Sequence, residues 1–186
     1  MGVLMDYKYK CGLYVGRFQP IHDGHRNVIC AMLKDCAEVI IAVGSAQKCG
    51  TLENPFSYST RAMLIYDSFA LCSDRLHIVP IFDREHPSND SSWGEYLMSN
   101  VLQLTGRMPD AVFEGTEDER ASWYDTCSVD IIRIDRDELP ISGTQIRADM
   151  LADNFDAVKA CVPLSVASLY GNLRKELLLC SQKPSI

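Results

Sequence analysis

Near its start the chain carries a short apolar run and a glycine-containing polar turn, Gly12-Leu13-Tyr14-Val15 followed by GRFQPIHDGH at residues 16–25. The next apolar residues fall at i, i+3, i+4 and i+7: Ile29, Met32, Leu33 and Cys36. That spacing places them on one face of a helix, whereas a continuous apolar run is typical of a strand that is buried on both faces. A buried strand that leads through such a turn into an amphipathic helix indicates an α/β fold.

The same alternation of apolar runs and helical spacing continues along the chain. Further strands are predicted at residues 39–43, 76–82, 111–113 and 129–134. Further helices are predicted from three sets of apolar residues: Ala62, Ile65, Tyr66 and Phe69; Leu97, Val101 and Leu104; Val166, Leu169, Tyr170 and Leu173. We therefore expect a parallel sheet of about five strands with helices on both faces. Ligands of such sheets bind at the carboxyl ends of the strands, where the strand order reverses.

The composition favours a single domain over residues 1–186. Of these residues 47% are hydrophobic and 23% are charged, which suffices for one core, expected over about residues 12–171. No apolar stretch approaches the roughly 18 to 20 residues of a membrane span, and the first ten residues carry no apolar signal region. The formal charge of −7 argues against a broad basic surface for nucleic acid or anionic lipid. We expect a cytoplasmic protein with neither nucleic-acid nor membrane partners.

Eight cysteines are spread along the chain without any Cys-x-x-Cys pair, so the spacings of zinc sites and redox motifs are missing. Free cysteine commonly packs as a small apolar residue. We expect buried thiols in a reducing compartment.

The turn after the first predicted strand carries two histidines, His22 and His25, three residues apart at the start of a helix. Residues at this spacing share one helix face, and the free N–H groups of a helix N-terminus attract phosphate. Imidazole donates hydrogen bonds to phosphate oxygens and can carry positive charge near neutral pH. Gly16 and Gly24 remove side chains where a ligand oxygen would approach the main chain. The turn therefore predicts a phosphate site, whereas a single histidine would be read as a capped or solvated residue.

A second polar turn, PISGTQIR at residues 140–147, follows the last predicted strand and leads into another helical pattern. Ser142 is a natural N-cap, and Thr144 and Arg147 are three residues apart on one face. Taken alone, this segment fits an ordinary cap and a surface arginine equally well. Together with the first turn, it predicts two helix N-termini that grip the ends of one polyphosphate.

These residues resemble the signatures of a known enzyme superfamily. The first turn resembles the HxGH signature of the nucleotidyltransferases, and residues 141–147 resemble their second signature, Ser-x-Thr-x-x-Arg. The segments GSAQ at 44–47 and TLENPF at 51–56, with Arg61 beyond them, are similar to the archaeal-type nicotinamide mononucleotide adenylyltransferases. The resemblance implies a Rossmann-like nucleotidyltransferase fold and transfer of AMP from ATP to nicotinamide mononucleotide, with Mg²⁺ bound mainly through the substrate phosphates rather than by protein ligands.

The resemblance also implies roles for particular residues. His22, His25 and Arg147 would be catalytic. The residues matched to ATP and phosphate binding are Gly16, Arg17, Phe18, Gln19, Gly24, Gly115, Ser142 and Thr144. The residues matched to the nicotinamide nucleotide are Trp93, Ser45 and Asp83. The other interpretation of Trp93 is an indole in the core or in an interface.

Three positions depart from the pattern of the family. Cys49-Gly50 stands where Ser-His is usual, Gly115-Thr116 where Gly-Asn is usual, and Ala148 follows Arg147 where a second arginine is usual. One alternative keeps the reaction and changes the acceptor to nicotinate mononucleotide, to phosphopantetheine, or to a phosphosugar or phosphoalcohol with CTP. Another is a nucleotide-binding regulator without turnover. The resemblance allows for a homo-oligomer, whose size the sequence does not give.

Overall fold

The structure, a computed structural model, describes residues 6–84, 91–115, 121–134 and 141–182. Its centre is a five-stranded sheet in the order β3-β2-β1-β4-β5, and every neighbouring pair of strands is parallel. The strands are β1 (Tyr9–Gly16), β2 (Cys36–Val43), β3 (Leu76–Pro80), β4 (Ala111–Gly115) and β5 (Asp130–Ile134). The prediction of a parallel sheet of about five strands is confirmed, because each predicted strand overlaps one observed strand.

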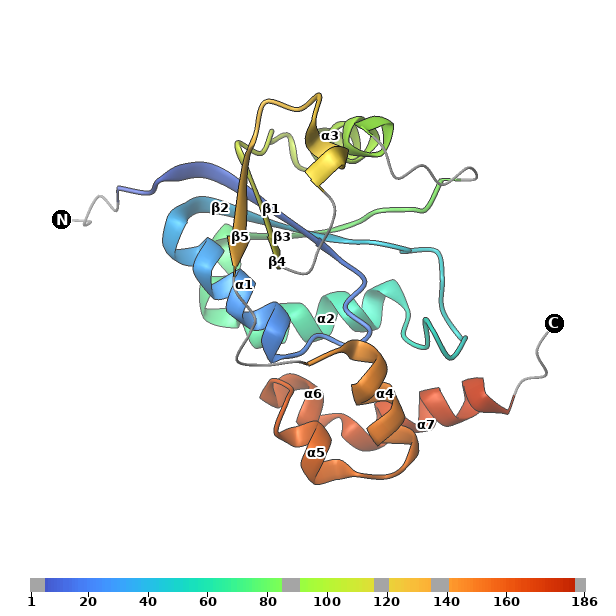
Figure 1. Ribbon diagram of the computed structural model, residues 1–186. Helices are drawn as coiled ribbons and strands as arrows, with labels where there is room; N and C mark the ends of the chain where they lie inside the picture. Colours follow the sequence, from blue (N-terminus) through green and yellow to red (C-terminus); the bar gives the residue numbers. More distant parts are fainter. Residues whose placement is uncertain (1–5, 85–90, 116–120, 135–140, 183–186) are drawn as a thin grey trace.

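Helices cover both faces of this sheet, as predicted (Figure 1). On one face lie α1 (Asp23–Asp35), α2 (Tyr58–Ser68) and the C-terminal helices, and on the other lie α3 (Ser91–Thr105) and the short 3-10 helix η2 (Ala121–Tyr124). The C-terminal helices are α4 (Gly143–Leu151), α5 (Phe155–Lys159), α6 (Leu164–Ser168) and α7 (Tyr170–Ser181). The 3-10 helix η1 (Ala70–Arg75) follows α2 in the chain.

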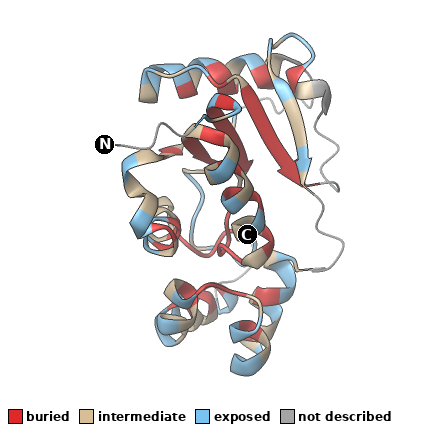
Figure 2. Cartoon of the chain, turned by 90° about the vertical axis from the view of Figure 1, so that its left-hand side faces the viewer, coloured by how far each residue is buried: buried red, intermediate tan, exposed pale blue. Residues whose placement is uncertain are grey.

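The central strands are buried on both faces because alternate side chains enter two different cores. On β1, Tyr14 packs in the core formed with α1, α2 and the C-terminal helices, whereas Leu13 and Val15 pack in the core formed with α3 and η2. On β2, Ile41 and Ile40 divide in the same way. Figure 2 shows the buried residues gathered in the strands and on the inner sides of the helices. This two-sided burial explains why these strands are continuous apolar runs in the sequence.

The strand order reverses beside β1, which has β2 on one side and β4 on the other. The carboxyl ends of β1 and β4 therefore border the crevice in which open α/β sheets bind their ligands. The turn with the paired histidines leaves β1 at this crevice.

The prediction of a single C-terminal helix over residues 166–173 is wrong, because the chain forms two helices there. α6 and α7 are separated at Leu169, whose φ of −102° and ψ of 10° are not helical. Val166 and Leu173 are both buried, as the spacing predicts, but they lie on different helices. Apolar spacing reports which residues are buried and does not detect a break between two short helices on the same core.

The buried face of α2 also differs from the prediction. Of the predicted apolar residues, Ile65 is buried, but Tyr66 is 49% exposed. The buried side chains of α2 are Arg61, Leu64 and Ile65. The helix therefore turns Arg61 toward the protein interior. The prediction missed this residue because it counted only apolar residues as candidates for the buried face.

The expectation of buried thiols is correct for only some of the cysteines. Cys11, Cys36 and Cys180 are buried, whereas Cys30 and Cys49 are exposed and the other three are partly exposed. Burial raises the pKa of the Cys11 thiol to about 11 and that of the Cys36 thiol to about 12. These two thiols therefore stay protonated and unreactive at neutral pH.

Pro140 and Thr116, on which parts of the sequence analysis rest, lie outside the described residues. In the part of the chain that the structure describes, no helix has both the length and the apolar character that a membrane crossing requires.

We predict that Gly94→Ala destabilises the protein by about 3 kcal/mol or more, because the added Cβ would lie 1.6 Å from the backbone oxygen of Trp123 and force α3 away from η2. Gly171→Ala is the matched control, since nothing lies within 4 Å of a Cβ at that position of α7. We expect that change to raise stability slightly, by up to about 1 kcal/mol. Urea unfolding followed by circular dichroism measures both variants, and equal midpoints would contradict the close packing of α3 on η2.

Candidate active site

The two histidines form the start of α1. His22 is the N-cap and His25 the third residue of the helix, in a capping-box arrangement. The backbone N–H of His22 donates to Nδ1 of His25 at 3.3 Å, and the two rings lie 3.7 Å apart between centroids. Because Nδ1 of His25 accepts this bond, Nε2 is the nitrogen that carries the ring proton. The expected sharing of one helix face by the two imidazoles is confirmed.

Two of the main-chain N–H groups at this helix end, which were predicted to attract phosphate, donate hydrogen bonds within the protein. The N–H of Asp23 donates to the carbonyl of Cys161 at 2.9 Å, and the N–H of His22 is taken by His25. Two amides that would point at an anion are thus used within the protein. The two imidazoles of this turn line the cavity described below.

Aromatic packing holds His25 in place. Phe18 is buried, with its ring 4.6 Å from that of His25 and 5.6 Å from that of Tyr14 between centroids. A Cβ on Gly16 would lie 2.9 Å from the Phe18 ring, so this glycine makes room for the phenyl group. Phe18 and Gly16, matched to phosphate binding by resemblance, thus have packing roles in the structure. Phe18 also has a φ of 51°, in the left-handed region.

Gln19 joins this turn to the segment at residues 51–56. Its buried side-chain amide donates to the carbonyl of Phe56 and accepts from the N–H of Phe56, both at 3.0 Å. The oxygen and the nitrogen of the Gln19 amide therefore both form hydrogen bonds with the backbone of Phe56. The structure gives Gln19 the role of a clamp between two loops, in addition to its place in the pocket wall.

The second turn reaches the first through Arg147. Ser142 is the N-cap of α4, as predicted, and its hydroxyl accepts from the N–H of Gln145 at 3.1 Å. Arg147 donates to the carbonyl of Gln19 at 2.9 Å and to the hydroxyl of Thr144 at 3.2 Å. A Cβ on Gly143 would lie 3.1 Å from the same Gln19 oxygen, so glycine permits this close approach.

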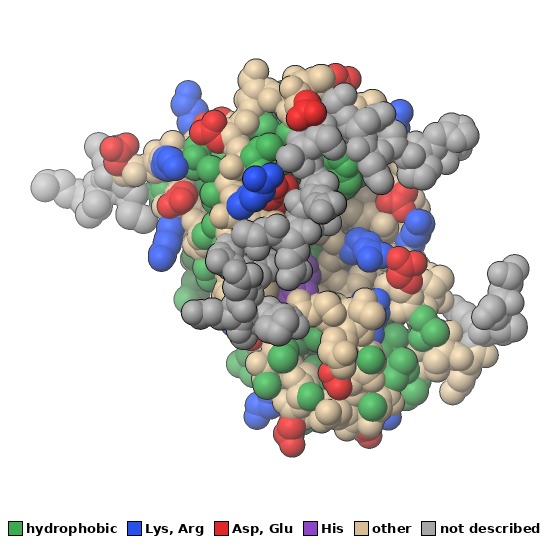
Figure 3. All heavy atoms as spheres, in the orientation of Figure 1, with side chains coloured by type: hydrophobic (Ala, Val, Ile, Leu, Met, Phe, Trp, Pro, Cys, Tyr) green, Lys and Arg blue, Asp and Glu red, His purple; other side chains and the backbone are tan. Residues whose placement is uncertain are grey.

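The two turns line one cavity of about 300 Å³. The predicted site residues that line it are Gly16, Arg17, Phe18, Gln19, His22, His25, Ser142, Thr144 and Arg147. The paired imidazoles and the Arg147 guanidinium therefore face the same cavity, although the segments that carry them are far apart in the sequence. Figure 3 shows a histidine side chain visible deep between the sheet layer and the C-terminal helices, with basic side chains on the same face.

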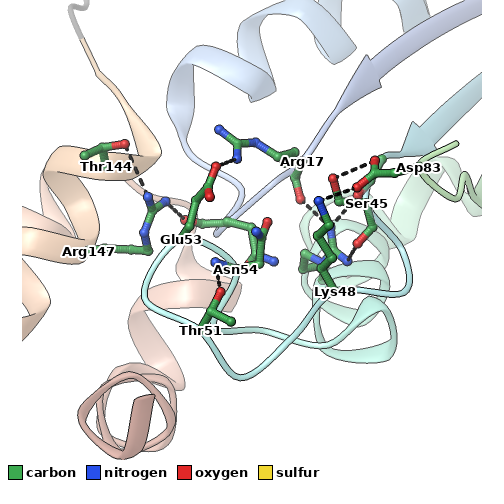
Figure 4. Close-up of polar contacts among 12 residues, drawn as sticks. Arg17, Ser45, Lys48, Thr51, Glu53, Asn54, Asp83, Thr144 and Arg147 are labelled. Carbon is green, nitrogen blue, oxygen red and sulfur yellow. Dashed lines mark hydrogen bonds and ion pairs between the residues drawn. The ribbon is translucent and has the colours of Figure 1, made fainter. Parts of the chain in front are cut away.

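The electrostatics of the cavity wall favour an anion. Burial lowers the pKa of Arg147, the positive charge of Arg17 lowers it further, and the carboxylate of Glu53 raises it. Arginine remains charged despite such shifts. Arg17 forms an ion pair with Glu53, drawn as a dashed line in Figure 4. Two guanidinium groups thus lie close enough to repel each other, and an anion between them would relieve that repulsion.

Arg61 supports the site from inside the protein and was not among the predicted site residues. It is fully buried, and it donates to the carbonyls of Arg17 and Gly44 at 2.8 Å and of Ser45 at 3.1 Å. It thereby fixes the loops that leave β1 and β2. Arg61 lies three and four residues before Leu64 and Ile65 and so shares their helix face, but this spacing does not by itself show that a charged side chain turns inward.

The residues matched to the nicotinamide nucleotide, Trp93, Ser45 and Asp83, are not part of the lining of this cavity. The Ser45 hydroxyl donates to Asp83 at 3.0 Å, and Lys48 pairs with Asp83 at 2.8 Å. Trp93 stacks on Tyr96 at 5.2 Å and meets Trp123 edge-on at 5.6 Å. Its indole N–H is buried and has no hydrogen-bond partner among the described residues.

The two other predicted glycines, Gly24 and Gly115, lie outside the lining of the cavity. Gly24 is buried in the first turn of α1, and Gly115 ends β4 opposite Ile134 of β5. Neither contributes to the cavity lining.

Among the described residues, no group of three or more His, Cys, Asp or Glu side chains is placed to hold a metal ion.

Comparison with known proteins places this geometry in a family. A family model described as cytidylyltransferase-like matches residues 13–149. The nicotinamide-nucleotide adenylyltransferase of Thermococcus kodakarensis is 31% identical over 172 residues, which covers 89% of this chain and 84% of that protein. The protein of the same name from Thermococcus onnurineus is 31% identical over 171 residues, with the same coverage.

A solved structure shows the same fold. It is a bifunctional NMN adenylyltransferase/ADP ribose pyrophosphatase from Francisella tularensis, complexed with AMP and a manganese ion. The TM-score is 0.70 at 21% identity, and the match covers 94% of this chain and 52% of that chain, so this chain spans about half of that longer protein. With the family model across both polar turns and the extended matches to the Thermococcus proteins, the chain belongs to the cytidylyltransferase-like family, in the group of the nicotinamide-nucleotide adenylyltransferases.

Proposed function

We propose that this protein transfers AMP from ATP to the phosphate of nicotinamide mononucleotide, giving NAD and pyrophosphate. One observation carries the proposal: the turn with the paired imidazoles and the turn with Arg147 line one cavity and are joined by the hydrogen bond from Arg147 to Gln19. The names of the Thermococcus relatives support the identity of the substrates.

The chemistry needs positioning and charge stabilisation more than a proton acceptor. The acceptor phosphate has a second pKa of about 6, so near pH 7 it is largely a dianion that attacks without a general base. Its oxygen forms a new bond to the α-phosphorus of ATP while the bond from that phosphorus to the bridging oxygen breaks, and pyrophosphate leaves with the electron pair. His22, His25 and Arg147 face the cavity in which this negative charge would develop.

His25 suits the role of a preorganised donor. Nδ1 is held by the N–H of His22, and Phe18 packs against the ring, so the orientation of the imidazole is fixed before any ligand binds. We propose that the Nε2 proton is donated to a phosphate oxygen in the transition state. Donors that need no reorganisation in the transition state contribute most to catalysis.

Magnesium would enter with the triphosphate. The described cavity wall supplies imidazole, guanidinium and hydroxyl groups and no carboxylate, which suits phosphate oxygens better than a bare cation. We propose that Mg²⁺ is held mainly by substrate phosphates, where it neutralises charge on the leaving pyrophosphate. We also propose action in the cytoplasm, which the eight free cysteines support.

The direct test is to incubate the protein with ATP, Mg²⁺ and nicotinamide mononucleotide and to follow NAD by an enzymatic assay. We expect NAD formation that EDTA abolishes and added Mg²⁺ restores. Parallel reactions with nicotinate mononucleotide, with phosphopantetheine and with CTP in place of ATP measure pyrophosphate release and identify the acceptor and the nucleotide. Tight ATP binding without product from any acceptor would overturn the proposed activity in favour of a regulator.

We predict that His25→Ala lowers kcat for NAD synthesis by about 100-fold or more, the scale of losing one preorganised donor, while ATP still binds. Asn27→Ala is the control, because Asn27 is an exposed residue of the same helix. Steady-state kinetics and calorimetric ATP binding separate catalysis from binding. A loss of kcat below fivefold would refute the role of His25.

For Trp93→Ala we predict a larger rise in KM for nicotinamide mononucleotide than in KM for ATP. An aromatic face attracts the cationic pyridinium by about 0.5 to 2 kcal/mol, which corresponds to a rise of about twofold to thirtyfold. Trp123→Ala is the control, because Trp123 belongs to the same aromatic cluster. Equal changes in the two KM values, or the same effect from Trp123→Ala, would assign Trp93 to packing instead.

A further inference from the structure

A carboxylate borders the anion-binding cavity, although the proposed substrates are anionic. The side chain of Glu53 forms an ion pair with Arg17, a residue of the cavity wall. The Glu53 and Arg17 side chains are 67% and 51% exposed. In Figure 4 the Glu53 side chain extends from its loop to Arg17. The Arg17 guanidinium in the cavity wall is therefore already bound to an anionic group of the protein.

The loop that carries Glu53 is fixed on both sides of this residue. Within it, the N–H of Asn54 donates to the hydroxyl of Thr51 at 3.0 Å, and the N–H of Thr51 donates to the carbonyl of Asn54 at 3.3 Å. Asn54 is buried, and Phe56 is clamped by Gln19. Because the turn is held in this way, it presents the carboxylate to Arg17 at little entropic cost.

The charge of Glu53 acts on more than one cation. Burial and the charge of Arg17 lower the pKa of Arg147, and Glu53 raises it. The hydrogen bond and charge of Asp83 raise the pKa of Lys48, and Glu53 raises it as well. The charge of Glu53 thus acts on Arg147 and Lys48 as well as on Arg17, its ion-pair partner.

We propose that Glu53 is an internal counter-ion that occupies Arg17 in the free protein and competes with polyphosphate for it. An exposed ion pair changes an equilibrium by no more than about fivefold, so a polyanion that offers several oxygens displaces the carboxylate readily. When pyrophosphate leaves, Glu53 takes Arg17 back. The residue therefore weakens polyphosphate binding and assists release of the product. This inference rests on the proposed function only for the identity of the anion.

The test is calorimetric binding of pyrophosphate, in EDTA, to the full-length protein and to Glu53→Gln. We expect Glu53→Gln to bind pyrophosphate about three- to fivefold more tightly at low ionic strength, with a smaller gain in high salt. Asp67→Asn is the control, because it removes the same charge from an exposed position of α2. We expect it to change the Kd by less than twofold.

Arg17→Met provides the second arm. If Glu53 acts by competing for Arg17, Glu53→Gln changes pyrophosphate affinity by less than twofold when Arg17→Met is already present. Unchanged or weaker binding by Glu53→Gln, or an equal gain with and without Arg17, would overturn the proposal. So would weaker binding of Mg-pyrophosphate by Glu53→Gln, since the carboxylate would then be a metal ligand.

The failure of this inference is distinct from the failure of the proposed activity. Pyrophosphate binding requires neither an acceptor nor turnover. A protein that makes no NAD but shows the expected change in Glu53→Gln would contradict the activity alone, and a protein that makes NAD without that change would contradict the counter-ion alone.

Discussion

Gln19 is the residue through which three separate parts of the site are held together. Its side chain clamps the backbone of Phe56, and its carbonyl accepts from Arg147, a residue 128 positions away. Polar groups buried in a protein must find partners, and here the partners are segments whose relative positions define the cavity. Through its contacts with Phe56 and Arg147, Gln19 links the first turn both to the loop at residues 51–56 and to α4.

An acidic protein can bind an anion when a few cations are gathered in one cavity. The chain carries a formal charge of −7, yet Arg17 and Arg147 line one cavity. Arg61 shows the opposite treatment, because its buried guanidinium is satisfied by backbone carbonyls. The protein thus uses one arginine for architecture and leaves others partly accessible, and total charge predicts neither.

Local spacing predicted the features that depend on neighbouring residues. The central strands are mainly apolar runs because both their faces are buried, and His22 and His25 share a helix face because they are three residues apart. Spacing failed where the outcome depends on distant packing. The break at Leu169 separates two short helices on one core, and the inward turn of Arg61 depends on carbonyls from other loops.

The clamp between the first turn and α4 has a consequence for the newly made chain. One wall of the cavity comes from residues 16–25 and the other from residues 141–147. A nascent polypeptide that ends before α4 possesses the paired imidazoles but lacks the opposite wall. A ligand that contacts both walls can therefore bind only molecules whose synthesis has passed that point, and such binding would stabilise the finished protein by mass action.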